Sequence, residues 1–282
     1  MVEVLKTGLL DTIQDLGRFG FSNYGVPASG VMDRYSALLG NSILGNDSNA
    51  AVIESIGFGP HLKFSKSTLI CVTGAIMNSS LDDVPIKNNV VIKVDEGSIL
   101  RFGKLEAGCR VYISVFGGFQ TEIIMNSRSM YRGVTSHEKL MKGDVLPILG
   151  LNKKNIPTFS SVKTDANHFK GNDLEVFKGP EFDFLSTFQQ ERLFNTLLTV
   201  SKESNRMAYQ FDEPFENDLK SIITSLVLPG TAQLTPSGKL IVLMRDCQIT
   251  GGYPRVLQLT EKSISKLSQQ FTCRKIALKR IN

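Results

Sequence analysis

A polar, glycine-rich stretch near the start of the chain contains residues suited to chemistry. It reads Gln14-Asp15-Leu16-Gly17-Arg18-Phe19-Gly20, then Gly25-Val26-Pro27-Ala28-Ser29-Gly30, and ends at Met32-Asp33-Arg34. Backbone N–H groups at the start of the predicted helix that follows favour an anion. Arg18 and Arg34 suit two-pronged recognition of a carboxylate or phosphate, and Asp15 and Asp33 suit a base, a metal ligand or a cap. We favour a ligand site in this loop; the alternative is that the glycines only form turns and Asp33 only caps the helix.

A second polar stretch surrounds a predicted strand over Leu240–Met244. Leu228-Pro229-Gly230-Thr231-Ala232-Gln233 precedes this strand, and Arg245-Asp246-Cys247-Gln248-Ile249-Thr250-Gly251-Gly252-Tyr253-Pro254 follows it. Packing alone does not require such residues after a strand. Adjacent glycines let the backbone approach a ligand, and Tyr253 offers an apolar ring with a polar tip. A plain turn between strands also uses Gly-Gly, so the structural alternative remains open.

Two further segments each place an arginine near a tyrosine. They are Ser127-Arg128-Ser129-Met130-Tyr131-Arg132 and Ser204-Asn205-Arg206-Met207-Ala208-Tyr209. Each pair suits either a carboxylate clamp or a structural surface contact, and the residues alone slightly favour the structural role.

The sequence also lacks several signatures. It contains no G-x-x-x-x-G-K-[ST] phosphate loop, no strand–G-x-G-x-x-G–helix dinucleotide site and no Ala-Met-Lys-Met-like biotin attachment sequence. The three histidines, His61, His137 and His168, are far apart and form no H-E-x-x-H pattern, which argues against a zinc site and leaves the candidate serines without a triad partner.

Composition points to an ordinary globular protein. The chain has 282 residues, 41% hydrophobic content, 21% charged content and a formal net charge of +5. Its lysines and arginines are scattered, which favours a solvated edge over a nucleic-acid surface even at the densest run, Arg274, Lys275, Lys279 and Arg280. Cys71, Cys109 and Cys247 lie in apolar runs and are expected to be free and buried. Without a leader pattern or a long apolar span, we expect a cytoplasmic protein.

Short β-branched and aromatic runs predict a mainly β protein, a sandwich or a barrel. The predicted strands are Val2–Thr7, Thr68–Thr73, Val90–Val94, Ile99–Phe102 and Val111–Phe116, with a hairpin turn at Asp95-Glu96-Gly97. Predicted helices span about Arg34–Leu44, capped by Asp33 and ended by Gly45; about Phe182–Val200, on the spacing of Leu185, Phe188, Phe194 and Leu197 or Leu198; and Glu261–Ser268, capped by Thr260.

Two domains are expected from the length and from one aperiodic, lysine-rich segment. The predicted N-terminal β domain covers residues 1–151 and carries the Gln-Asp-x-Gly-Arg loop. The predicted linker covers residues 152–172, and the C-terminal β domain covers residues 173–282.

In their order along the chain, these motifs resemble the family that contains the C subunit of 5-oxoprolinase, the second subunit of allophanate hydrolase-like proteins and part of the carboxyltransferase domain of urea carboxylase. The resemblance runs from about residue 8 to residue 260. It rests on Gln14-Asp15-x-Gly17-Arg18-x-Gly20, Gly25-Val26-Pro27-x-Ser29-Gly30-x-Met32-Asp33, Asn41-x-x-x-Gly45-Asn46, Glu54, Ser127-Arg128-Ser129, Ser204-x-Arg206-Met207-x-Tyr209, Pro229-Gly230-x-x-Gln233 and Asp246-x-Gln248-x-Thr250-Gly251-Gly252-Tyr253-Pro254.

The resemblance implies a cyclophilin-like β-barrel architecture with two or three helices. It also implies work with two partners, a chain like the B subunit of 5-oxoprolinase and a lactam-utilisation-type chain, the A subunit. Together these chains are expected to convert 5-oxoproline to glutamate with ATP and Mg²⁺ bound in the complex and no biotin attached to this chain.

Within these motifs, residue type leads us to expect a set of site residues. The expected catalytic residues are Asp15, Arg18, Asp33 and Asp246. The expected substrate-binding residues are Gln14, Arg34, Arg128, Arg206, Gln233, Thr250, Gly252 and Tyr253, and no metal ligands are assigned.

Two departures from the family pattern bear on activity. A glycine-rich loop usually follows the position of Tyr131, whereas this chain has Val134-Thr135-Ser136-His137-Glu138-Lys139; Thr235 and Lys239 stand where proline is commoner. Two other functions are therefore kept beside the 5-oxoprolinase role. One is a regulatory protein that binds and antagonises a histidine-kinase inhibitor resembling the B subunit. The other is a carboxyltransferase or allophanate hydrolase-related component that acts on urea-like amides.

Overall fold

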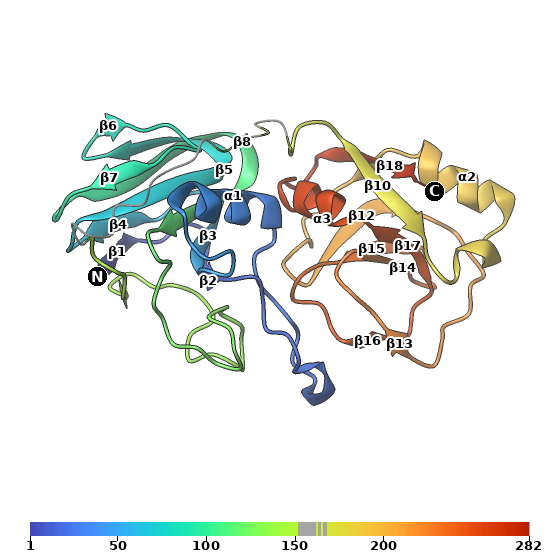
Figure 1. Cartoon of the computed structure of the whole chain (residues 1–282). Helices are drawn as coiled ribbons and strands as arrows, with labels where there is room; N and C mark the ends of the chain where they lie inside the picture. Colours follow the sequence, from blue (N-terminus) through green and yellow to red (C-terminus); the bar gives the residue numbers. More distant parts are fainter. Residues whose placement is uncertain (152–161, 163–164, 166–167, 282) are drawn as a thin grey trace. The chain divides into compact units, whose positions relative to one another are not determined.

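The computed structural model describes residues 1–151, 162, 165 and 168–281 (Figure 1). It divides the chain into two compact units. Unit 1 comprises residues 1–19 and 33–166, and unit 2 comprises residues 20–32 and 167–282. The segment 20–32, part of the first glycine-rich stretch, therefore belongs to the same unit as the second polar stretch. Most of the predicted linker, 152–172, lies outside the described residues.

Unit 1 is built on one strongly bent sheet. Its strands follow the order β2-β3-β8-β4-β1-β9, and β5 pairs with β6, β7 and β8. The elements are β1 (Val2–Lys6), β2 (Leu10–Gln14), α1 (Arg34–Leu44), β3 (Val52–Ile56), β4 (His61–Phe64), β5 (Thr68–Leu81), β6 (Val84–Pro85), β7 (Ile92–Val94), β8 (Ile99–Val115) and β9 (Val145–Leu146). The two long strands β5 and β8 form the spine of the sheet, and β2 and β9 form two of its edges.

The strand predictions for unit 1 need two corrections. The runs predicted as separate strands at Ile99–Phe102 and Val111–Phe116 belong to one strand, β8, because irregular pairing with β5 carries the polar stretch between them. The hairpin predicted at Asp95-Glu96-Gly97 is wrong. Gly97 does adopt φ 89°, but β7 pairs with β5, while β8 pairs with β3, β4 and β5.

Helix α1 packs its apolar side chains against the long strands of the sheet. Leu39, Ile43 and Leu44 form a cluster with Leu69 and Cys71 of β5. At Gly40 the helix comes so close to β8 that an added Cβ would lie 2.5 Å from the Ser114 hydroxyl oxygen. The predicted bounds and both caps, Asp33 and Gly45, are confirmed.

Unit 2 is a nearly closed barrel. Its main sheet follows the order β11-β18-β10-β17-β14-β15-β12, and an isolated bridge between Val200 and Phe211 joins its two ends. The elements are η1 (Ser22–Tyr24), β10 (Asp173–Lys178), η2 (Phe182–Phe184), α2 (Thr187–Asn195), β11 (Leu198–Thr199), β12 (Ala208–Pro214), β13 (Ser225–Leu226), β14 (Thr231–Leu234), β15 (Lys239–Leu243), β16 (Thr250–Gly251), β17 (Arg255–Leu259), α3 (Glu261–Ser268) and β18 (Lys275–Arg280). This confirms the mainly β, barrel-like fold class.

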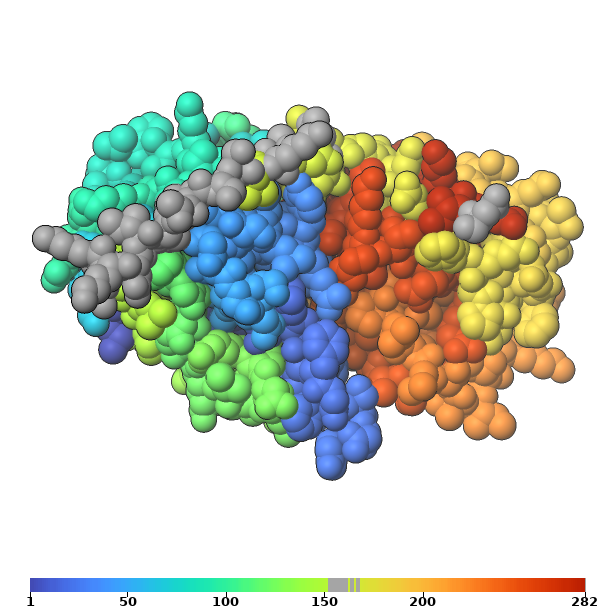
Figure 2. Space-filling view, viewed as in Figure 1, coloured from blue at the N-terminus to red at the C-terminus, as the bar shows by residue number. Residues whose placement is uncertain are grey.

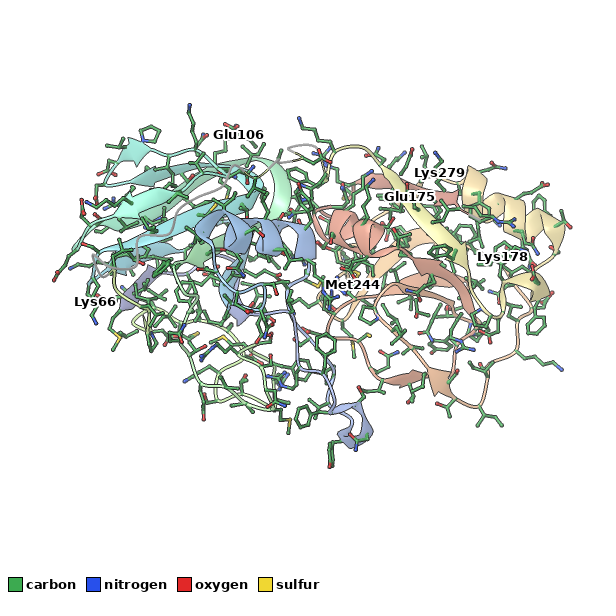
Figure 3. All side chains as sticks on the ribbon, viewed as in Figure 1. Lys66, Glu106, Glu175, Lys178, Met244 and Lys279 are labelled. Atoms are coloured by element: carbon green, nitrogen blue, oxygen red, sulfur yellow. The ribbon has the colours of Figure 1, made fainter. Side chains whose placement is uncertain are left out.

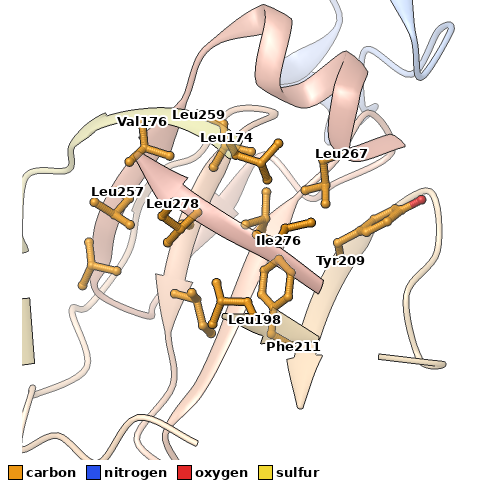
Figure 4. Close-up of a cluster of buried hydrophobic side chains, with 14 of the residues drawn as sticks. Leu174, Val176, Leu198, Tyr209, Phe211, Leu257, Leu259, Leu267, Ile276 and Leu278 are labelled. Carbon is orange, nitrogen blue, oxygen red and sulfur yellow. The ribbon is translucent and has the colours of Figure 1, made fainter. Parts of the chain in front are cut away.

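The barrel interior is packed with aliphatic and aromatic side chains. Figure 4 shows Leu174, Val176, Phe211, Leu257 and Ile276 converging there, with Leu267 of α3 at one side. Met244, labelled in Figure 3, is fully buried in the same core, as is Met32 from the 20–32 segment. The segment 20–32 thus contributes to the core of unit 2.

The helix predicted over Phe182–Val200 is wrong in extent. A 3₁₀ turn at Phe182–Phe184 ends before Ser186, whose side chain caps a new helix, α2, in a capping box with Gln189. Phe188 and Leu197, two members of the predicted apolar face, are 72% and 54% exposed. The chain beyond Asn195 turns extended because Leu198 and Thr199 pair with β18.

Candidate functional site

The Asp15 carboxylate organises the segment Ser127-Arg128-Ser129 in unit 1. It accepts hydrogen bonds from the hydroxyls of Ser127 (2.7 Å) and Ser129 (2.6 Å) and from the backbone N–H groups of Arg128 (2.6 Å) and Gly17 (2.9 Å). Asp15 is 3% exposed. The geometry therefore makes it an anchor for this loop, and a catalytic role for Asp15 stays a prediction.

Arg18 and Gln14 hold the neighbouring backbone. Arg18 is 1% exposed and donates to the carbonyl oxygens of Ser129 (2.7 Å) and Ile124 (3.3 Å). Gln14 Nε2 donates to the carbonyl oxygen of Met130 (3.2 Å), and Met130 N donates in turn to the carbonyl of Ile13 on edge strand β2. The loop is thus fastened along an edge of the sheet by buried polar groups.

Asp33 and Arg34 stand at the start of α1. The Asp33 carboxylate accepts from the backbone N–H (3.1 Å) and the hydroxyl (2.6 Å) of Ser36, as an N-cap does. The Asp33 N–H donates to the Tyr112 hydroxyl, and that hydroxyl donates to Glu54. Burial, then the charges of Glu54 and Asp33, raise the pKa of Tyr112 well above its ordinary value. Arg34 donates to the carbonyl of Leu16 and lies 6.0 Å from the ring of Phe19.

Arg128 lines a cavity of ≈ 290 Å³ in unit 1. The cavity lies within the long connection between β8 and β9, which occupies the surface of unit 1 in green to yellow-green in Figure 2. Its lining combines apolar with polar and charged side chains: Gln120, Thr121, Glu122, Ile124, Arg128, Met130, Thr135, Ser136, His137, Leu140, Asp144, Val145, Leu146 and Pro147. Buried Leu140 and Leu146 supply apolar wall.

The loop that departs from the family pattern contributes directly to this lining. Thr135 closes it into a compact turn, since its hydroxyl accepts from Tyr131 N (2.9 Å) and lies 2.7 Å from the carbonyl oxygen of His137. Thr135, Ser136 and His137 all line the cavity. The substituted loop is therefore ordered without extra glycines.

In unit 2 an ion pair between buried Arg206 and partly buried Asp246 joins the two polar stretches. Arg206 donates to both carboxylate oxygens of Asp246 (2.7 and 3.0 Å), and its guanidinium also reaches the carbonyl of Gly30 (2.7 Å). The Ser29 hydroxyl donates to Asp246 at 2.5 Å. This cluster secures the 20–32 segment in unit 2, and the catalytic role of Asp246 and the binding role of Arg206 stay predictions.

The remaining predicted residues gather around the small β13–β16 ribbon of unit 2. Gln233 is buried and donates to the carbonyl of Tyr253 (3.2 Å), and a Cβ on Gly251 would lie 2.6 Å from Gln233 Nε2. Thr250 is exposed and Tyr253 is 43% exposed, whereas Gly252 lies close to the carbonyl of Ile222. The glycine pair is thus explained by close packing, and Thr250 and Tyr253 present polar groups to solvent.

Comparison with known proteins identifies the family of this chain. The family model described as carboxyltransferase domain, subdomain A and B, matches residues 24–280. This chain belongs to that family. It is 30% identical to the C subunit of 5-oxoprolinase from Escherichia coli (strain K12) over 275 residues, 95% of this chain and 87% of that protein. It is 35% identical to urea amidolyase of Lachancea kluyveri over 229 residues, 75% of this chain and 12% of that protein.

The fold of this family member also matches a solved structure. The crystal structure of TTHA0988 superposes with a TM-score of 0.88 at 24% identity, covering 99% of this chain and 55% of the other. This chain therefore spans about half the length of that protein. The likeness supports the mainly β architecture of both units.

Three cysteines of this carboxyltransferase-family chain, Cys71, Cys109 and Cys247, are buried and poor candidates for chemistry. All four are free, and burial raises the pKa of Cys71 and of Cys247 to about 12 and also raises that of Cys109. A thiol so difficult to ionise is a weak nucleophile and metal ligand. Among the described residues, no group of three or more His, Cys, Asp or Glu side chains is arranged to hold a metal ion. Within the same residues no helix is long and apolar enough to cross a membrane.

Sequence reasoning finds the anchors of the loop but misses part of the cavity. Gln14, Asp15, Arg18 and Arg128 come together in unit 1, with Asp33 and Arg34 at the adjoining helix start. Arg206 and Asp246 come together in unit 2, as do Gln233, Gly252 and Tyr253. Gln120 and Thr121 belong to none of the sequence motifs, although Gly117 and Gly118, at φ 73° and 75°, mark the turn that places them.

Proposed function

We propose that this chain is a component of an ATP-dependent 5-oxoprolinase that converts 5-oxo-L-proline to L-glutamate. One observation carries the proposal, namely the similarity to the C subunit of 5-oxoprolinase over 95% of this chain and 87% of the relative. The name of that relative supports a complex with further subunits. We propose that these are a chain like the B subunit and a lactam-utilisation-type A subunit, assembled in the cytoplasm.

The proposed reaction requires activation of a lactam. A lactam carbonyl is a poor electrophile, and ATP bound in the complex supplies the chemistry that activates its oxygen. The mixed apolar and charged lining of the cavity beside Arg128 supports a role for this chain in binding and orienting 5-oxoproline.

The test is 5-oxoproline-dependent glutamate formation by co-expressed candidate A and B subunits, with and without this chain. We expect glutamate, together with ADP in step with it, only when this chain is present. Reactions lacking 5-oxoproline or ATP serve as controls. Full activity from the A and B subunits alone, or no glutamate from the assembled, folded complex, would overturn the proposal.

The urea amidolyase similarity favours a second candidate, a carboxyltransferase component that acts on urea-like amides. Such a component needs biotin carried on another chain. The same complex, supplied with a carboxybiotin-loaded carrier protein and urea, distinguishes the two candidates. Carboxylation of urea without glutamate formation from 5-oxoproline would place this second function first.

A further inference from the structure

The ≈ 290 Å³ cavity of unit 1 has the size and lining of a small-molecule site. A space of this size holds about ten water molecules, so it accommodates a ligand with roughly ten non-hydrogen atoms. Apolar contacts come from Ile124, Met130, Leu140 and Leu146, while Arg128 is a cation on the same lining. This combination suits a compact ligand that carries a carboxylate on a partly apolar ring.

Arg128 is positioned for such a ligand by its neighbours. Its backbone N–H is fixed by Asp15, and its guanidinium donates to Gln120 Oε1 at 3.2 Å. Gln120 is itself held, because its Nε2 donates to the carbonyls of Gly117 (2.7 Å) and Gly118 (3.0 Å). A guanidinium has five N–H donors in a planar fork, so this contact leaves donors to engage a carboxylate.

Two acidic side chains on the same lining complement the Arg128 cation. Glu122 and Asp144 add acceptors for an N–H group and disfavour a second carboxylate on the ligand.

We propose that this cavity binds 5-oxo-L-proline, with Arg128 engaging its carboxylate. This inference rests on the proposed function and makes it specific. The lactam ring lies against the apolar wall, and its N–H faces the acidic side chains. Gln120 acts as a positioning residue that orients the guanidinium.

The experiment measures binding by isothermal titration calorimetry, using the full chain and the assembled complex. The probes are 5-oxo-L-proline, pyrrolidin-2-one, which lacks the carboxylate, and L-glutamate, which has a second one. We expect 5-oxo-L-proline to bind at least about tenfold more tightly than either of the others. Equal affinity for pyrrolidin-2-one would overturn the role of Arg128.

Variants locate the site. Arg128→Met retains the backbone contact with Asp15 and should weaken 5-oxo-L-proline binding about tenfold or more. Arg132→Met is the matched control, because the Arg132 side chain is exposed and lies outside the cavity lining. This variant should bind 5-oxo-L-proline with the affinity of the wild type. Thermal unfolding confirms that each variant is folded.

The outcomes separate this inference from the proposed function. Glutamate formation by the complex, with 5-oxo-L-proline affinity unchanged by Arg128→Met in both preparations, would overturn the inference and leave the function standing. Arg128-dependent binding without turnover would support the inference and count against the function. Absence of binding in both preparations would overturn the inference.

Discussion

The Asp15 carboxylate accepts four hydrogen bonds from three positions of one loop and from Gly17, and this explains an acidic residue that is 3% exposed. Hydrogen bonds to a charged acceptor each contribute about 1.5–3 kcal/mol, so the cluster is a large local contribution to stability. The Gln-Asp-x-Gly-Arg motif is, in these terms, a device that fixes the loop bearing Arg128.

The substitution Asp15→Asn should therefore destabilise the protein. The amide of the new side chain would turn an NH₂ group toward hydroxyl and N–H donors, and we expect the free energy of unfolding to fall by about 3 kcal/mol. Urea unfolding followed by circular dichroism measures it. Asp212→Asn, at an exposed position, is the control. Equal stability of the two variants would contradict the anchoring role.

Asp11 supplies a pH-dependent prediction. It is 1% exposed, and its carboxylate accepts from the backbone N–H of Gly8 at 2.6 Å. Burial raises the pKa of Asp11 above its ordinary value of 3.8, against the opposing effect of hydrogen bonds from Ser55 and Gly8. The folded state then binds this proton more tightly than the unfolded state does, so ionisation of Asp11 costs stability as pH rises above 3.8.

The comparison is between the wild type and Asp11→Asn, which has no proton to lose. We expect the stability of the wild type, relative to this variant, to fall as pH increases from about 4 toward 7 and to level off above the folded pKa. Urea unfolding at successive pH values measures the difference. A difference that stays flat or rises with pH would contradict the raised pKa.

At the scale of elements, Asp33 illustrates how a predicted site residue can have a local structural role. It is fully buried, and both of its carboxylate oxygens accept from Ser36 at the start of α1. The geometry favours the capping alternative over a part in catalysis, because neither oxygen is exposed.

Substitutions at position 33 distinguish the two roles. Asp33→Ala should lower the free energy of unfolding by about 1–2 kcal/mol, and Asp33→Ser, which can still cap, should lower it by less. In the assembled complex we expect Asp33→Ser to retain glutamate formation within a few-fold. Loss of turnover in a folded Asp33→Ser variant would instead establish a catalytic role.

At the scale of the whole molecule, the chain enters unit 2 at residue 20, returns to unit 1 at residue 33 and enters unit 2 again after residue 166. The segment 20–32 makes buried contacts in unit 2. Met32 is fully buried in the barrel core, and Ser29 and Gly30 bind the Arg206–Asp246 pair. Unit 2 is therefore completed by residues far from it in sequence.

Cleavage of the chain tests whether residues 20–32 hold the two resulting fragments together. A protease site inserted within residues 152–161 should yield two fragments that remain together on size-exclusion chromatography, because the first fragment supplies residues 20–32 to unit 2. A fragment of residues 167–282 expressed alone should give a poorly dispersed NMR spectrum. Separation of the nicked fragments without denaturant would contradict the prediction.

Local sequence pattern was enough to predict the mainly β class, the bounds of α1 and α3, and the helix caps Asp33, Gly45 and Thr260. It was also enough to predict the burial of Cys71, Cys109 and Cys247 and the family resemblance. These properties depend on local pattern: periodicity, a capping side chain, a glycine after a helix. The helix predicted around residues 182–200 is wrong because its apolar spacing took no account of the cap at Ser186 or of pairing between β11 and β18.

Which polar side chains contact one another could not be predicted from the motifs and depends on the three-dimensional fold. Asp15 accepts hydrogen bonds from Ser127 and Ser129, more than a hundred positions away. Ser29 donates a hydrogen bond to Asp246 at a separation of 217 residues. The cavity beside Arg128 exists because the β8–β9 connection is fastened to a sheet edge by such contacts. Long-range pairing depends on strand order and on the path of the chain between units, and neither is encoded in the spacing of residues within a motif.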